Sequence, residues 1–104
     1  MKLTRYHYTQ LIALILNKRA GWVSLGALNA ARRQPLLTHY HRANELADLE
    51  KAGLVSIEPG KNDTGIILLT DAGRAAILSM PDDIGSRAYP LPVDIAKAKA
   101  KLRT

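Results

Sequence analysis

The sequence predicts an α+β fold in which helices predominate, and three features of its pattern support that class. Apolar residues recur at helical spacing in three segments, residues 9–18, 25–33 and 39–52. Residues 55–58 alternate apolar with polar side chains, as a half-buried strand does, and residues 66–69 form a second β-prone run. The segment 59–65 between these runs is rich in Pro, Gly, Asn and Asp, so the two runs predict a β-hairpin.

The first predicted helix should lie at the centre of the fold. Residues 11–16 are all apolar, so neighbouring elements should cover this helix on nearly every side, and Gly21 is expected to end it. Ser24 is the expected N-cap of the second helix, and Pro35 prevents that helix from continuing. Trp22 is expected to pack between the short β-prone segment that contains it and the hairpin.

The third predicted helix, residues 39–52, has N- and C-terminal signals in the sequence. Thr38 is its N-cap candidate, and Gly53 stands where a helix end favours a left-handed residue. Leu46 and Leu49 lie in the second half of this helix, and we expect them to dock it on the core.

A fourth short helix, residues 72–78, is expected after an N-cap at Thr70 or Asp71. Residues 1–80 then form one domain. Residues 81–104 are expected to be a C-terminal extension that is partly flexible or helical, because its alternating Ala and Lys residues are good helix formers.

The composition predicts a soluble, cytoplasmic protein with an anionic partner. The formal net charge is +6, and residues 1–35 hold six basic residues and no acidic one. The absence of Cys excludes disulfides and thiolate metal sites. The longest apolar run, residues 11–16, is too short for a signal peptide or a membrane span, so we expect no membrane contact.

Two motifs resemble those of a known superfamily. Residues 46–55 read L-x-x-L-E-x-x-G-L-V and residues 69–73 read L-T-x-x-G. With the order helix, short strand, helix, helix, hairpin, helix, this pattern resembles winged helix-turn-helix DNA-binding domains of MarR-like bacterial and phage regulators over roughly residues 5–80. The resemblance implies a three-helix core, a β-hairpin wing and an extra C-terminal helix. It also implies a transcriptional regulator whose third helix enters the major groove.

Candidate DNA-binding residues fall into three groups. Those that could face the major groove from the third helix are Thr38, His39, His41, Arg42 and Asn44. Arg can read guanine and Asn can read adenine, while Thr and a helix N-terminus can hold phosphate. Arg32, Arg33 and Gln34 precede this helix, where they could clamp the DNA backbone. Lys61 and Asn62 lie at the predicted wing tip, where they could touch the adjacent minor groove or phosphates.

Acidic residues in the third helix favour an alternative function. Glu45, Asp48 and Glu50 would repel phosphate if they faced DNA, although the last two lie in the half of the helix that is usually turned away. The alternative is a winged-helix protein–protein interaction module or adaptor that has no sequence-specific DNA binding.

No pattern predicts catalysis, a cofactor or a metal site. The sequence has no Gly-rich phosphate loop after a strand and no evident nucleophile–base pair. His39 and His41 are two residues apart on a presumed helix, so they should point in different directions. We therefore expect a non-enzymatic regulator that binds double-stranded DNA. We also expect it to form a homodimer through the first helix and the segment after Pro81.

Overall fold

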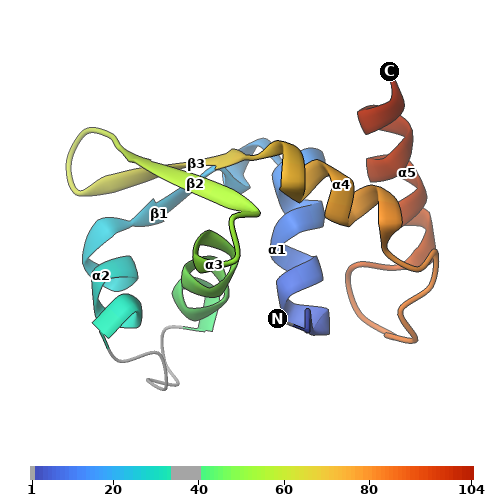
Figure 1. Ribbon diagram of the computed structural model, residues 1–104, viewed down its shortest axis with the longest axis horizontal. Helices are drawn as coiled ribbons and strands as arrows, with labels where there is room; N and C mark the ends of the chain where they lie inside the picture. Colours follow the sequence, from blue (N-terminus) through green and yellow to red (C-terminus); the bar gives the residue numbers. More distant parts are fainter. Residues whose placement is uncertain (1, 34–40) are drawn as a thin grey trace.

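The computed structural model describes residues 2–33 and 41–104, and Figure 1 shows their arrangement. The elements are α1 (Arg5–Leu16), a 3₁₀ turn η1 (Lys18–Ala20), β1 (Trp22–Ser24), α2 (Leu25–Arg33), α3 (His41–Lys51), β2 (Val55–Pro59), β3 (Thr64–Leu69), α4 (Asp71–Ser79) and α5 (Pro92–Arg103). In these residues the chain has five α-helices and one three-stranded antiparallel sheet. The predicted α+β, mainly helical class is therefore confirmed.

The local signals for helix ends are confirmed at three positions. The Ala27 N–H donates to Ser24 Oγ over 3.3 Å, and the Gly73 N–H donates to Thr70 Oγ1 over 3.0 Å. After the end of α3, Gly53 has a φ of +78°, a left-handed conformation that costs glycine little. The predicted N-cap Thr38 and the first residues of the expected helix 39–52 lie outside the described residues.

The sequence indicated residues 9–18 as the core of the first helix, and the structure places the helix about one turn earlier. The helix begins at Arg5 rather than near residue 9, and it ends at Leu16 rather than Lys18. Its start is stabilised by the His7 side chain, whose Nδ1 accepts the Thr4 N–H over 3.0 Å. Its end is set by Asn17, whose side chain accepts the Arg19 N–H and so starts the 3₁₀ turn.

The sheet has the strand order β1-β3-β2, so the predicted hairpin is confirmed and the short strand β1 joins it along β3. The hairpin turns at Asn62 and Asp63, which have φ values of 53° and 60°. Asn and Asp tolerate this left-handed region better than most residues, and two such residues in succession match the twist of a two-residue hairpin turn. The Thr64 N–H closes the turn by donating to the Lys61 carbonyl over 3.1 Å.

The expectation that Trp22 is a packing residue was wrong, because its side chain is 52% exposed. Successive side chains of a strand point to opposite faces of the sheet, and in β1 the inward position is taken by Val23, which is 3% exposed. Trp22 therefore faces outward, as do its cross-strand partner Ile66 and the nearby Leu68.

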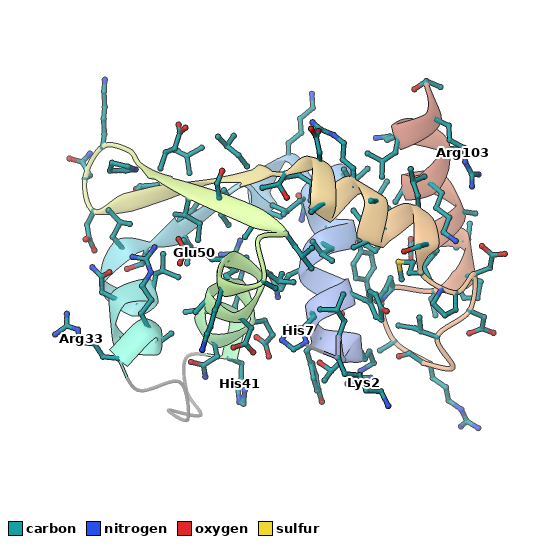
Figure 2. The ribbon with its side chains drawn as sticks, in the orientation of Figure 1. Lys2, His7, Arg33, His41, Glu50 and Arg103 are labelled. Carbon is teal, nitrogen blue, oxygen red and sulfur yellow. The ribbon has the colours of Figure 1, made fainter. Side chains whose placement is uncertain are left out.

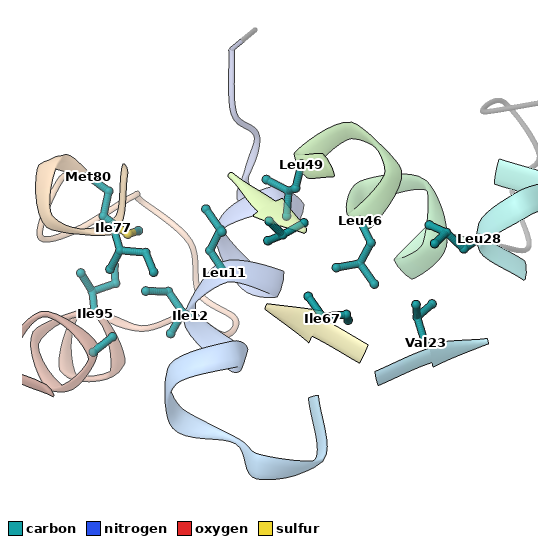
Figure 3. Packing of buried hydrophobic residues seen from close by; sticks show 12 residues of the cluster. Leu11, Ile12, Val23, Leu28, Leu46, Leu49, Ile67, Ile77, Met80 and Ile95 are labelled. Atoms are coloured by element: carbon teal, nitrogen blue, oxygen red, sulfur yellow. The ribbon is translucent and has the colours of Figure 1, made fainter. Parts of the chain in front are cut away.

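α1 lies at the centre of the hydrophobic core. Leu11 and Ile12 are completely buried, and Figure 3 shows them between two groups of apolar side chains. One group comes from α2, α3 and the sheet, and the other from α4 and α5. Ile95 and Ala98 of α5 are also completely buried, so part of the predicted extension 81–104 is a helix that shares the core of residues 2–80. The domain boundary at residue 80 stays a prediction.

A helix that crosses a bilayer must be long and apolar. Among the helices of residues 2–33 and 41–104, none is long and apolar enough to cross a bilayer.

Substituting Gly73 tests the close approach of α4 to Leu54, the residue before β2. A Cβ at this position would collide with the Leu54 carbonyl oxygen and would lie 2.7 Å from Leu69 Cδ1. Gly→Ala within a helix normally stabilises it, but here we expect Gly73→Ala to lower the free energy of unfolding by roughly 1–3 kcal/mol through overpacking. Urea denaturation measures this change. Gly21→Ala is the control, because only the Lys18 carbonyl lies near its Cβ, at 3.9 Å. Equal stability of Gly73→Ala and wild type would contradict the packing described.

Candidate nucleic-acid interface

α3 is positioned by an apolar stripe that leaves its opposite face outward. Ala43, Leu46 and Leu49 are buried, at helical spacing, and they pack α3 against α1, α2 and the sheet. This confirms the predicted docking by Leu46 and Leu49. The C-terminal end of α2 and the first described turn of α3 lie at one edge of the molecule (Figure 2).

Two of the predicted site residues are exposed at that edge. Arg33 ends α2 and His41 begins the described part of α3, and both side chains point away from the core (Figure 2). Neither α2 nor α3 has an acidic residue in its first turn. Gln34, Thr38 and His39, which the sequence also places in the site, lie outside the described residues.

Arg32 is held within the chain by an ion pair with α3. Its Nε and Nη2 donate to the two carboxylate oxygens of Glu50 over 2.9 and 2.6 Å, and its Nη1 donates to Asn29 Oδ1 over 2.9 Å. The hydrogen bond to Glu50 raises the pKa of Arg32 above its ordinary value, with a further contribution from the opposite charge. A phosphate would therefore have to compete with Glu50 for this guanidinium.

Arg42 is turned toward the interior and not toward solvent. Its Nη2 donates to the Ala20 carbonyl over 2.7 Å, and burial of the guanidinium lowers its pKa. The side chain thereby connects the start of α3 to the 3₁₀ turn after α1. The neighbouring candidate Asn44 is half-buried. Base reading by Arg42, as the sequence predicted it, would require the Ala20 contact to break.

The hairpin tip is the second exposed part of the predicted site. Lys61 and Asn62 are exposed there. The next residue, Asp63, fixes the tip to the N-terminal end of α2: its carboxylate accepts from Ser24 Oγ over 3.4 Å and from the Gly26 N–H over 3.3 Å. Its carbonyl also accepts the Leu25 N–H over 2.9 Å. The tip and Arg33 are thus at opposite ends of α2, whose nine residues span about 12 Å at 1.5 Å per residue.

Asp48 of α3 is bound by His7 of α1, a contact that the sequence analysis missed. Because His7 Nδ1 accepts the Thr4 N–H, the neutral ring carries its proton on Nε2, which donates to Asp48 Oδ2 over 2.9 Å. The spacing Thr4-x-x-His7 resembles that of a capping box and could have indicated the first of these two bonds. The second joins residues 41 positions apart, which no local pattern indicates.

Glu45, the third acidic residue of α3, lies beside α1. It lines a cavity of about 440 Å³ together with Tyr6, Gln10 and His41. Burial raises the pKa of Glu45, and the nearby His7 and His41 oppose this shift more weakly. Tyr6 is 57% exposed at the rim, and the Arg5 guanidinium lies 4.7 Å from the centroid of its ring, which makes a cation–π contact.

The described residues offer no group of three or more His, Cys, Asp or Glu side chains that could hold a metal ion.

Comparisons with known proteins identify no relative of this chain. No protein-family model matches it, no curated protein matches it, and no solved structure matches it.

The position of Glu45 predicts a pH-dependent change in stability. A carboxyl whose pKa is raised on folding stabilises the protein below its unfolded pKa, and this contribution is lost as the pH rises through the folded pKa. Glu45→Gln has no carboxyl to ionise, so it avoids this loss of stability as the pH rises. We therefore expect the variant to be more stable than wild type at about pH 7 and equal to it near pH 3.5, in urea denaturation followed across this range.

The control is Glu58→Gln on the exposed side of β2, which removes the same charge. If Glu45→Gln were less stable than wild type at neutral pH, the burial described for Glu45 would be incorrect.

Proposed function

We propose that the chain is a small winged helix-turn-helix protein that binds double-stranded DNA through α2, α3 and the hairpin β2–β3. The observation that carries the proposal is the arrangement of these elements. α3 packs against α2, the hairpin follows α3 directly, and Asp63 ties the hairpin tip to the start of α2. In this arrangement α3 serves as the recognition helix and the hairpin as the wing.

Exposed cations at both ends of α2 support an anionic ligand. Arg33 lies at one end and Lys61 lies beside the other, and neither forms an ion pair with the described part of the chain. They lie at opposite ends of α2, a helix about 12 Å long, so they could contact different phosphates of the same duplex, which recur every ~3.4 Å along one strand. Phosphate contacts at these two points would orient the first turn of α3 toward the major groove of the DNA.

The internal contacts of α3 determine which part of the helix is available to DNA. Glu50 is paired with Arg32 and Asp48 accepts from His7, and both lie in the second half of the helix. Among the described residues of the first turn, His41 is the exposed predicted contact, since Arg42 points inward. We therefore propose that phosphate contacts supply most of the affinity, which makes binding strongly dependent on salt.

Comparing three arginines tests this proposal. Arg33→Ala should weaken binding to a dye-labelled duplex of mixed sequence and lower the slope of log Kd against log salt concentration by about one. Fluorescence anisotropy over a salt series measures both quantities. Arg32→Ala should weaken binding less than Arg33→Ala but lower the stability more, because its guanidinium is paired with Glu50.

Arg103→Ala is the matched control. Arg103 is an exposed arginine on α5, at the opposite side of the molecule from Arg33 (Figure 2), and its loss should change neither the affinity nor the slope beyond the general effect of one charge. Failure of the wild-type chain to bind any duplex at low salt would overturn the proposal and favour the protein-interaction alternative. Equal losses in Arg33→Ala and Arg103→Ala would also contradict it.

A further inference from the structure

A groove between α1 and α5 lies outside the proposed DNA interface. It has a volume of about 790 Å³, and the apolar part of its lining, called its floor below, comes from Ala13 and Leu16 of α1 and from Ala100 of α5. α1 separates this groove from α3, because it packs against α3 on one side and α5 on the other (Figure 1). The groove is therefore free for a second ligand while α3 faces DNA.

Hydrogen bonds hold each wall of the groove to a neighbouring segment of the chain. At one end, Thr9 Oγ1 of α1 lies 3.1 Å from the Tyr89 carbonyl oxygen, to which it can donate, and Tyr89 lines the groove beside it. Buried Lys99 fixes the rotation of α5, because its Nζ donates to the Met80 carbonyl over 2.6 Å and to Asp82 Oδ1 over 2.8 Å. A preformed groove binds a ligand without an ordering cost in the protein.

The α5 wall presents positive charge. Lys97 and Lys101 line the groove one helical turn apart; both are exposed, and neither makes an ion pair within the described chain. The one carboxylate in the lining is that of Asp94, which accepts the Leu91 N–H over 2.9 Å and caps the start of α5. An occupant with carboxylates opposite the two lysines would complement this wall.

We propose that this groove binds an amphipathic helix of a partner protein, with an apolar stripe on the groove floor and carboxylates opposite Lys97 and Lys101. The α1 wall runs from Thr9 to Asn17, about 12 Å or two helical turns at 1.5 Å per residue. The small side chains of Ala13 and Ala100 let the backbone of a helix approach closely. A stripe at i, i+3, i+4 and i+7 is the usual form in which a helix occupies such a groove.

Charge disfavours a second copy of this chain as the occupant. The exposed side of α5 is basic, so two α5 helices would repel each other across a symmetric interface. In the described helices the carboxylates are partly buried or already have partners: Glu45 of α3 is half-buried beside α1, and Asp94 caps α5. Asp48 and Glu50 of α3 are held by His7 and Arg32, and Asp71 of α4 is paired with Arg74.

The test is a selection from displayed helical peptides, using the full chain as bait. The library fixes the apolar stripe and varies the flanking positions among Glu, Lys and Gln. We expect Glu to be enriched beside the stripe, and a selected acidic peptide to bind roughly tenfold more tightly than its lysine counterpart in fluorescence anisotropy. Lys97→Glu combined with Lys101→Glu should reverse this preference, and Ala100→Trp, at an exposed position, should abolish binding of both peptides.

The control Lys51→Glu with Arg87→Glu makes the same change in net charge away from the groove and should keep the preference for the acidic peptide. Circular dichroism checks that each variant folds. The proposal would be overturned if the wild-type bait enriched no more peptides than the Ala100→Trp bait, or if acidic and basic peptides bound equally. A dimer of the wild-type chain that Ala100→Trp dissociates would also overturn it, because the groove would then belong to a second copy. Displacement of the peptides by decanoate below its micelle-forming concentration would overturn it as well, because the groove would then bind a small amphiphile. Because DNA is absent from this experiment, its failure leaves the proposed DNA binding unaffected.

Discussion

Burial of α1 on two opposite sides is the constraint on which the other elements depend. Leu11 and Ile12 are adjacent in sequence and both completely buried, so they point to different parts of the core. Figure 3 shows Ile12 on the side of Ile77 and Ile95, and Leu11 on the side of Leu49. The helix thereby joins α2, α3 and the sheet to α4 and α5 in one core. Any movement of α1 would therefore alter the proposed DNA interface and the α1–α5 groove together.

Helix packing also determines which charged side chains are paired within the chain. Where α2 meets α3, Arg32 and Glu50 neutralise each other, and Arg42 replaces part of its hydration with the Ala20 carbonyl. The first contact holds α2 to α3 and the second holds α3 to the 3₁₀ turn after α1, so each engages a guanidinium group within the chain. The positive potential that remains comes from exposed side chains such as Arg33 and Lys61, whose long flexible stems let them reach phosphates at little cost in protein stability.

The features that the sequence predicted are those encoded within a few residues. Ser24 and Thr70 cap helices through their own hydroxyl groups, and Gly53 adopts the left-handed conformation that its missing side chain permits. The exposure of Trp22 could not be derived in this way, because it depends on which face of the sheet the helices cover. The pairing of His7 with Asp48 and the inward turn of Arg42 also arise only when α1 and α3 pack. The internal contacts of Arg32 and Arg42 thus depend on how the helices pack, whereas the exposed positions of the candidate site follow from their local place in the sequence.

We propose that DNA binds on the α2, α3 and hairpin side of α1 and leaves the α5 side free. The most direct test is the change in backbone amide chemical shifts when a DNA duplex is titrated into the isotopically labelled chain at low salt. The account predicts the largest changes at Arg33, at His41 and around Lys61, with little change at Lys97 and Lys101. Large changes along α5 with none at the hairpin tip or at the end of α2 would contradict it.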